Sequence, residues 1–339
     1  MPLIDRRQGL WSMAALGLAS ALPLAWRRAQ AATPARTLAV VEKGAGRVAF
    51  YALPQGRLLG TVPLGPQPHE MVADAGGAFA YVGGYGVKGW QYGGEGGHEL
   101  FVIDLANRRL VRNIDLAPHC RWHGIRMDAK GRLYALSETD SLLARFDRPQ
   151  TAEHPDRMIP VGGARSHYFV VTADGGRAYA ADTMSGMVIM VDPDDASFAP
   201  VKQHIGQAPE GLALSPDERT LYVIDRPAGM LHALDAVTLR PRARMALRGE
   251  AVRVIVASDG RLIVSNTADK SLTRHSPATL AEEARLPLPA AAPGLNLPAG
   301  STTLYAALED NRIAIVDLAG WRIIGDFATG DAPDTAVLL

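Results

Sequence analysis

The chain has 339 residues, 47% of them hydrophobic and 21% charged, and its formal net charge at pH 7 is zero. A chain of this length and composition can bury a large core. The balanced charge gives no electrostatic footprint for nucleic acid or for an anionic membrane surface, so neither is expected as a partner. Cys120 is the single cysteine, so no intrachain disulfide is available and stability must come from packing.

The N-terminus has the pattern of a secretory signal peptide over residues 1–31. Paired arginines at positions 6 and 7 precede an apolar segment, Leu10–Trp26, and small residues follow it at Ala29–Ala31. The arginine pair favours the twin-arginine export route. The alternative, a permanent membrane span, is disfavoured because the apolar run is short and interrupted by Pro23. We therefore expect a soluble periplasmic protein that begins near residue 32 and contains no membrane span.

From Leu38 onward the chain repeats one pattern of short apolar runs separated by turns. The clearest copy is Ser166–Asp192, in which three runs alternate with a turn at 174–176 and a short loop. This is the pattern of three strands in meander order. Further copies start near Pro209 and Val252, and others lie downstream of His123 and His69.

The spacing of the copies predicts the fold. Their opening residues are 40 to 54 positions apart, a period typical of β-propeller blades. The last copy has an opening strand only, and the segment from Leu38 lacks one, so together they complete a blade. We predict an all-β, seven-bladed β-propeller with four-stranded antiparallel blades, one of them closed by both termini, as a single domain over residues 32–339. The opening residues are His69, His123, His167, Glu210, Arg253, Gly294 and Asp334.

Two residue types recur at fixed places in the repeat, where they are expected to serve packing and turn formation. Tyrosines open the second strands, and aspartates end the third strands, where they can accept hydrogen bonds from turn amides. These sets are Tyr81, Tyr134, Tyr179, Tyr222 and Tyr305, and Asp104, Asp147, Asp192, Asp235 and Asp317.

Residues that depart from the repeat are better candidates for function. In a propeller, the loops into the first strand and those between the second and third strands share the face over the channel mouth. Packing gives no reason for three consecutive blades to open with histidine. We expect His69, His123, His167 and Glu210 to hold one divalent metal whose identity is open. Two alternatives are a polar pocket without metal, and structural hydrogen bonds to loop carbonyls and channel waters.

An insertion over 83–98, GGYGVKGWQYGGEGGH, lengthens the first histidine blade on the same face. It is rich in glycine and carries Tyr85, Trp90, Tyr92 and His98. Such a segment is suited to close over a cofactor or small organic ligand. The alternative is a hairpin extension that binds nothing.

Further candidates for catalysis lie at the same predicted face. Glu210, Arg253 and Asp182 are expected there, with Arg253 binding an anionic group and the carboxylates acting as general base or binding substrate. Glu138 and Asp225 occupy loop positions like that of Asp182, and all three could be ordinary solvated loop ends. Cys120 has basic neighbours, but an unpaired thiol is more often inert.

The strand motifs carry a family resemblance. Tyr222–Asp225, Leu100–Asp104 and Ile313–Asp317 resemble the YVTN-repeat, YncE-like propellers of bacterial periplasms, over roughly residues 37–339. The five copies with tyrosine depart from the namesake motif, since their fourth position is Gly84, Ser137, Asp182, Asp225 or Leu308 and not asparagine. A fainter similarity runs to propeller lactonases and to streptogramin lyases, which work at the channel mouth. The resemblance implies a fold and a compartment more than a reaction.

Two functional classes fit these observations. The first is a metal-dependent hydrolase or lyase acting on a small ester or lactone. The second is a non-catalytic propeller that binds a metal, a cofactor or a partner at the same mouth. The expected partners are a small molecule or a periplasmic protein.

Overall fold

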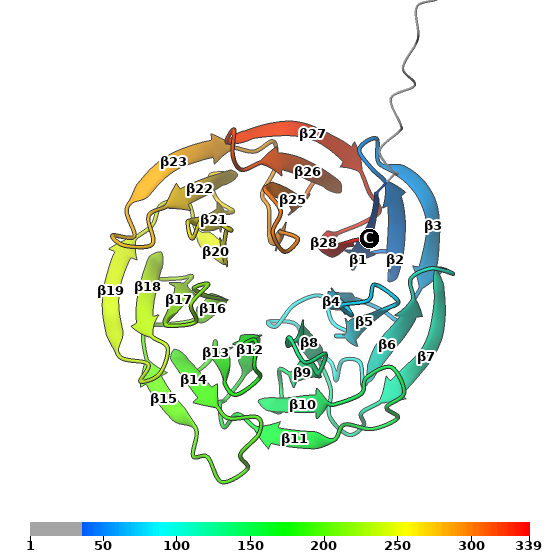
Figure 1. The fold of residues 1–339 in the computed structure, drawn as a ribbon, viewed down its shortest axis with the longest axis horizontal. Coiled ribbons are helices and arrows are strands. Elements are labelled where there is room, and N and C mark those ends of the chain that lie inside the picture. Colours follow the sequence, from blue (N-terminus) through cyan, green and yellow to red (C-terminus); the bar gives the residue numbers. More distant parts are fainter. Residues whose placement is uncertain (1–35) are drawn as a thin grey trace, which may run out of the picture. The chain divides into compact units, whose positions relative to one another are not determined.

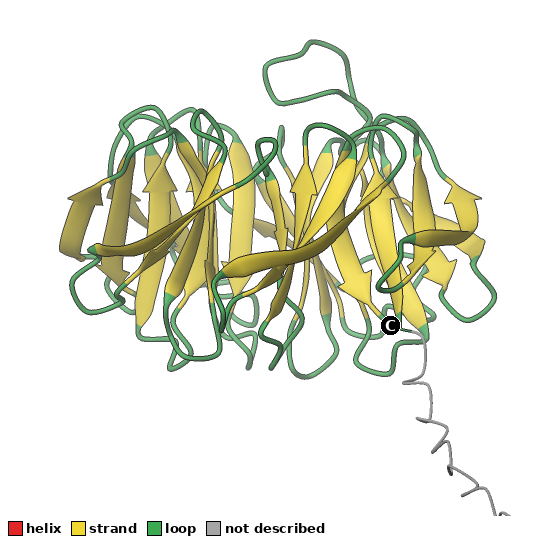
Figure 2. Ribbon diagram, turned by 90° about the horizontal axis from the view of Figure 1, so that it is seen from above, coloured by secondary structure: helices red, strands yellow, loops and turns green. Residues whose placement is uncertain are grey.

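A computed structural model describes residues 36–339, which form one compact unit of 28 strands in seven sheets. The predicted signal peptide, residues 1–31, lies outside the described residues. The sheets follow one another in a ring (Figure 1) and stand side by side in a disc (Figure 2). The predicted seven-bladed propeller is confirmed.

The blades are numbered here from the one that contains both ends of the ring. Blade 1 holds β28 (Pro333–Leu338), β1 (Thr37–Glu42), β2 (Arg47–Ala52) and β3 (Arg57–Pro63). Blade 2 holds β4 (Pro68–Ala73), β5 (Phe79–Gly84), β6 (Glu99–Asp104) and β7 (Arg109–Asp115). Blade 3 holds β8 (Trp122–Met127), β9 (Leu133–Ser137), β10 (Leu142–Phe146) and β11 (Arg157–Pro160). Blade 4 holds β12 (Ser166–Val171), β13 (Ala178–Asp182), β14 (Met187–Val191) and β15 (Val201–His204).

The remaining blades repeat the same order. Blade 5 holds β16 (Pro209–Leu214), β17 (Thr220–Asp225), β18 (Met230–Asp235) and β19 (Pro241–Ala246). Blade 6 holds β20 (Ala251–Val256), β21 (Leu262–Asn266), β22 (Ser271–His275) and β23 (Glu282–Pro287). Blade 7 holds β24 (Gly294–Asn296), β25 (Thr303–Leu308), β26 (Arg312–Asp317) and β27 (Arg322–Ala328).

The ring is closed by strand pairing at blade 1. The C-terminal strand β28 pairs antiparallel with β1, with Ala39 opposite Val337. The inner edge of blade 1 is therefore formed by a strand from the opposite end of the described chain (Figure 1). This pairing joins distant parts of the sequence and leaves no gap between the first and last blades.

Apolar side chains fill the spaces between blades. Each neighbouring pair of sheets encloses one cluster of buried residues in the described part of the chain, so the core is divided into seven parts. Trp122 of blade 3, for example, packs with Tyr81 and Leu100 of blade 2. The five repeated tyrosines are all buried, as their packing role requires.

Four of the five aspartates predicted at the ends of the third strands accept hydrogen bonds from turn amides, whereas Asp147 contacts Arg145. Asp235 Oδ1 accepts hydrogen bonds from the amides of Val237 and Thr238, and Asp104 Oδ1 accepts one from Asn107. Over residues 36–339 no helix is long and apolar enough to cross a lipid bilayer.

Candidate functional site

The innermost strands share an irregularity close to their first residues. In six blades the pairing with the second strand shifts register there, which leaves one or two residues in a β-bulge. A bulge bends the strand and turns a side chain away from the regular pleat. The residues within the shifts are His69 with Glu70, His123, His167, Glu210 with Gly211, Val252, and Asp334 with Thr335.

The three bulged histidines form a continuous stack. The ring centroids of His69 and His123 are 4.0 Å apart, and those of His123 and His167 are also 4.0 Å apart. The Tyr85 ring meets His69 and His123 edge-on, with centroids 5.1 Å away in both cases. The three imidazoles, which were predicted to lie at one mouth, are therefore in direct contact.

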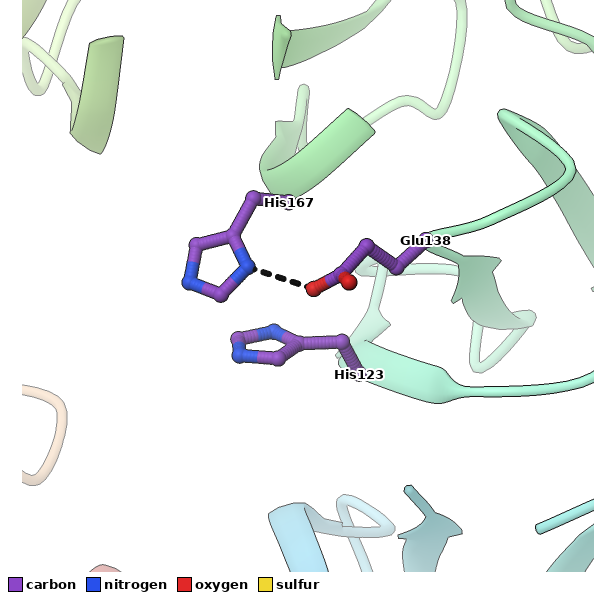
Figure 3. A group of neighbouring side chains, drawn as sticks. All are labelled: His123, Glu138 and His167. Atoms are coloured by element: carbon purple, nitrogen blue, oxygen red, sulfur yellow. Dashed lines mark hydrogen bonds and ion pairs between the residues drawn. The ribbon is translucent and has the colours of Figure 1, made fainter. Parts of the chain in front are cut away.

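His167 is oriented by a buried carboxylate. Its Nδ1 lies 2.7 Å from Oε2 of Glu138 (Figure 3). The same oxygen accepts a 2.8 Å hydrogen bond from the Tyr85 hydroxyl. Burial by itself would raise the pKa of Glu138, but the contacts with His167 and Tyr85 lower it overall. Glu138 therefore orients the His167 ring through its contact with Nδ1.

His69 has a similar partner on the other side of the stack. Its Nδ1 lies 2.6 Å from Oδ2 of Asp334, and its Nε2 lies 3.3 Å from Nζ of Lys43. Burial, and then the charge of Lys43, lower the pKa of His69. Burial opposes ionisation of Asp334, but the attraction of His69 and Lys43 brings its pKa far below the ordinary value. This half of the stack is therefore a buried histidine–carboxylate pair.

His123, in the middle, is different. Its side chain is fully buried, and neither ring nitrogen has a hydrogen-bond partner among the described residues. Its pKa is well below the ordinary value, because burial penalises the imidazolium and because His69, His167 and Arg253 repel it. A buried polar group without a partner is costly, so two such atoms in one ring indicate that a ligand completes the site.

The donors around His123 suit a metal ion. Within residues 36–339, His123, Glu138 and His167 form the one group whose nitrogen and oxygen ligand atoms all lie within 4.8 Å of one another (Figure 3). Two imidazoles and a carboxylate are a donor set that zinc and other divalent transition metals accept. Two of the four predicted ligands, His123 and His167, belong to this group, whereas His69 and Glu210 do not. Glu138, expected only as a rim carboxylate, takes the third place.

Glu210 and Arg253 reach the same region. Oε1 of Glu210 lies 3.9 Å from Nε2 of His167 and 3.7 Å from Nη1 of Arg253, and its Oε2 accepts a hydrogen bond from Arg226 at 3.2 Å. Burial opposes ionisation of Glu210, but His167, Arg253 and Arg226 lower its pKa. The Arg253 guanidinium donates no hydrogen bond to any described residue, although its side chain is only 12% exposed.

The predicted opening residue of blade 6 is displaced by one position from those of the other repeats. Val252, not Arg253, occupies the bulge position that His167 occupies in blade 4. Arg253 corresponds instead to Tyr168, and its guanidinium lies 4.6 Å from the Tyr168 ring. The prediction that Arg253 opens a blade is thus corrected, although its long side chain still reaches the cavity.

Asp182 is not brought to the cavity. As the last residue of β13, it is buried and accepts hydrogen bonds from the amides of Arg165 and Ser185. Side chains alternate along a strand, so the residue one position later is the one that turns toward the channel.

That later position forms a second ring of side chains, which sequence analysis did not recognise as a set. Each is the residue directly after the second strand of its blade, and five of the seven line the cavity. These residues could have been identified from the sequence, because each occupies the same position of its repeat, directly after the second strand. They are Lys43, Tyr85, Glu138, Thr183, Arg226, Thr267 and Glu309.

The insertion after β5 lies over this cavity (Figure 1). Tyr85 and Trp90 line the cavity, as predicted for this insertion. Tyr92 is 47% exposed and His98 forms a hydrogen bond between its Nδ1 and the carbonyl of His119, and neither lines the cavity. Two arginines attach the insertion to the ring. Arg121 donates to the carbonyls of Tyr92 and Gly94, and Arg165 donates to that of Trp90.

The same two arginines approach the carboxylate of the metal group. Nη1 of Arg121 lies 3.6 Å from Oε1 of Glu138, and Nη1 of Arg165 lies 3.9 Å from it. Gly96 allows the insertion to pass close to the Arg121 side chain, since its φ is +98° and a Cβ there would lie 2.4 Å from Cγ of Arg121. The position of the insertion is thus linked to the charge at Glu138.

The resulting cavity at the mouth has a volume of about 580 Å³. It is lined by cations and anions together: Lys43, Lys88, Arg226 and Arg253 with Glu210, Glu309, Asp331 and Asp334. Its size is that of a small-molecule site, and its mixed charge suits a polar ligand with an anionic group.

Comparisons with known proteins give weak but consistent relatives. No protein-family model matches the chain. It is 26% identical to a 6-phosphogluconolactonase of Sodalis glossinidius over 45% of this chain and 48% of that protein. It is 22% identical to the uncharacterized protein YncE of Salmonella typhimurium over 63% of this chain and 57% of that protein. The chain therefore spans about half the length of the curated relatives it matches.

Solved structures show the same fold at low identity. A proposed 6-phosphogluconolactonase from Bacteroides uniformis superposes with a TM-score of 0.71 at 15% identity, covering 90% of this chain and 99% of that one. A functionally unknown protein from Desulfotomaculum acetoxidans gives a TM-score of 0.70 at 12% identity, covering 89% and 98%. The similarity to YncE and to propeller lactonases expected from the strand motifs is confirmed.

Proposed function

We propose that the protein is a metal-dependent hydrolase that opens a small ester or lactone carrying an anionic group. The observation that carries this proposal is the pair of unpartnered ring nitrogens on His123, one of which lies within 4.8 Å of a ligand atom of His167 and of one of Glu138. A divalent ion held by these three residues would supply Lewis-acid activation of a carbonyl or of a water molecule.

The surrounding side chains supply the remaining roles. Glu210 lies beside Nε2 of His167, where its ionised carboxylate can accept a proton from an attacking water. Arg253 has unused donors and lines the cavity, so it can bind a carboxylate or phosphate on the substrate. Trp90 covers the mouth and would limit access of bulk water. Similarity to a protein named 6-phosphogluconolactonase supports a lactone as the substrate class.

A second candidate is a binding propeller without turnover. The carboxylate of Glu210 already contacts Arg226 and Arg253, which weakens its basicity. A metal, a cofactor or a periplasmic partner could then occupy the same mouth without reaction.

Metal analysis and one substitution separate these candidates. We expect the purified protein to bind about one divalent ion per chain and to hydrolyse a phosphorylated sugar lactone faster than the uncharged lactone. His123→Ala should lower metal affinity by at least about tenfold and reduce hydrolysis by about a hundredfold or more. Stoichiometric metal with no turnover would support the binding function.

A matched control uses a histidine outside the cavity. His232 on β18 is also buried, being 5% exposed, and lies away from the mouth. His232→Ala should leave metal content and hydrolysis unchanged. Absence of bound metal from the wild-type protein, with equal activity in His123→Ala, would refute the metal site.

The location of the protein is a separate proposal. The arginine pair and apolar segment of residues 1–31 support export by the twin-arginine route to the periplasm. N-terminal sequencing of the protein from a periplasmic fraction should start near residue 32. Replacing both arginines with lysine should keep the precursor in the cytoplasm, and normal export of that variant would contradict the route.

A further inference from the structure

A second cavity occupies the other half of the channel. It has a volume of about 570 Å³ and is lined by the later residues of the innermost strands, beyond the bulges. Because these strands start at the mouth, their later residues lie toward the opposite face. Arg253 and Asp334 line both cavities and so form part of the layer that separates them.

One wall of this second cavity is apolar. It is formed by innermost strands and the segment after β24, and its large side chains are only partly buried. Partly exposed aliphatic side chains along a polar channel favour an aliphatic ligand. The wall includes Ile255, Val256, Leu295, Leu297 and Val337.

The opposite wall carries two arginines, Arg126 and Arg253, and two carboxylates, Glu70 and Asp334. The Tyr168 ring has Arg126 and Arg253 against it, with the guanidinium carbons 4.7 Å and 4.6 Å from the ring centroid. Arg126 is neutralised by Glu70, whose Oε2 accepts its hydrogen bond at 2.6 Å.

Arg253 has no comparable partner among the described residues. Its nearest carboxylate oxygen is that of Glu210, at 3.7 Å, and Asp334 is engaged by His69 and Lys43. The cavity therefore combines an apolar wall with a guanidinium whose donors are unused.

We propose that this half of the channel binds a medium-chain aliphatic monocarboxylate, with its carboxylate at Arg253 and its chain along the apolar wall. An anionic head group would supply the hydrogen-bond acceptors that Arg253 lacks. The chain would cover the partly buried aliphatic side chains of the apolar wall. The site shares Arg253 with the proposed substrate-binding mouth, but it needs neither a metal nor turnover.

Calorimetric titration of the wild-type full chain tests the proposal directly. Octanoate should bind saturably at one site per chain. Octylammonium, which has the same chain and the opposite charge, should show no saturable binding. Acetate, which lacks the chain, should bind at least about a hundredfold more weakly. No saturable octanoate binding, or equal binding of octylammonium, would overturn the proposal.

Substitutions locate the ligand. Arg253→Gln should weaken octanoate binding by about tenfold or more. Leu297→Asp, which places a carboxylate against the chain, should abolish it. Leu58→Asp is the matched control, since Leu58 lies on the outer strand β3 and is already 49% exposed; it should leave binding unchanged.

A further variant excludes the other cavity. Trp90 lines the mouth cavity and not the second cavity, so Trp90→Ala should not change octanoate affinity. Loss of affinity in Trp90→Ala, or full affinity in Leu297→Asp, would place the ligand elsewhere and contradict the assignment.

Discussion

Trp122 and His123 are consecutive residues of β8, yet they belong to two regions with opposite properties. Trp122 packs between blades 2 and 3, and its Nε1 donates a hydrogen bond to the carbonyl of His119. His123 is equally buried but stacks between His69 and His167, and both of its ring nitrogens lack partners among the described residues. The spaces between blades stabilise the fold, whereas the histidine stack holds buried polar atoms that no described residue satisfies.

The largest expected effect is a loss of stability when the packing between blades is disrupted. Trp122→Ala removes the largest fully buried side chain between blades 2 and 3, and should lower the free energy of unfolding by about 3–5 kcal/mol. Chemical denaturation followed by tryptophan fluorescence and circular dichroism measures this. A loss below about 1 kcal/mol would show that the space between the blades collapses easily.

The second prediction concerns pH and the mouth. The pKa values of His69 and His123 are lowered, so the unfolded chain takes up more protons below about pH 6.5 and stability falls there. The lowered pKa values of Glu138, Glu210 and Asp334 extend this loss at lower pH, as each carboxylate is protonated. Melting in the presence of chelator should give a Tm several degrees lower at about pH 5 than at about pH 7.5. A Tm that does not change over this range would contradict the buried neutral imidazoles.

A smaller effect of opposite sign should follow from His123→Leu. The substitution removes two unpartnered polar atoms from a buried site, so the metal-free protein should gain about 1 kcal/mol in free energy of unfolding. The pH dependence should also become shallower between about pH 6.5 and about pH 5. Urea denaturation with chelator measures both, and a loss of stability would mean that an ordered water normally satisfies the ring.

The smallest effect concerns the insertion at the mouth. Arg165→Ala removes the hydrogen bond to the carbonyl of Trp90 and should cost less than about 1 kcal/mol of global stability. Amide exchange over residues 86–97 should nevertheless become faster, because Arg121 would be left as the arginine that holds that segment. Unchanged exchange would show that Arg165 does not fix the insertion.

The repeat made much of the site predictable. A fixed period places one residue per blade at the mouth, so the spacing of three distant histidines was enough to assign them to one location. Buried tyrosines and turn-binding aspartates followed from the same repetition. The two errors of position had one cause. Asp182 lies one residue before the channel-facing position, and Arg253 lies one after the bulge, and in a strand one residue reverses the direction of a side chain.

The sequence by itself determined the number of blades, their closure by the C-terminal strand, and the face on which the histidines meet. These features depend on hydrophobic periodicity and chain connectivity, which are written locally in each repeat. Only the tertiary structure decided that His123 has no partner among the described residues, that Glu138 rather than Glu210 completes the donor group, and that Arg253 faces two cavities. Those outcomes depend on bulge geometry and on distances of a few ångströms between blades, which no local pattern specifies.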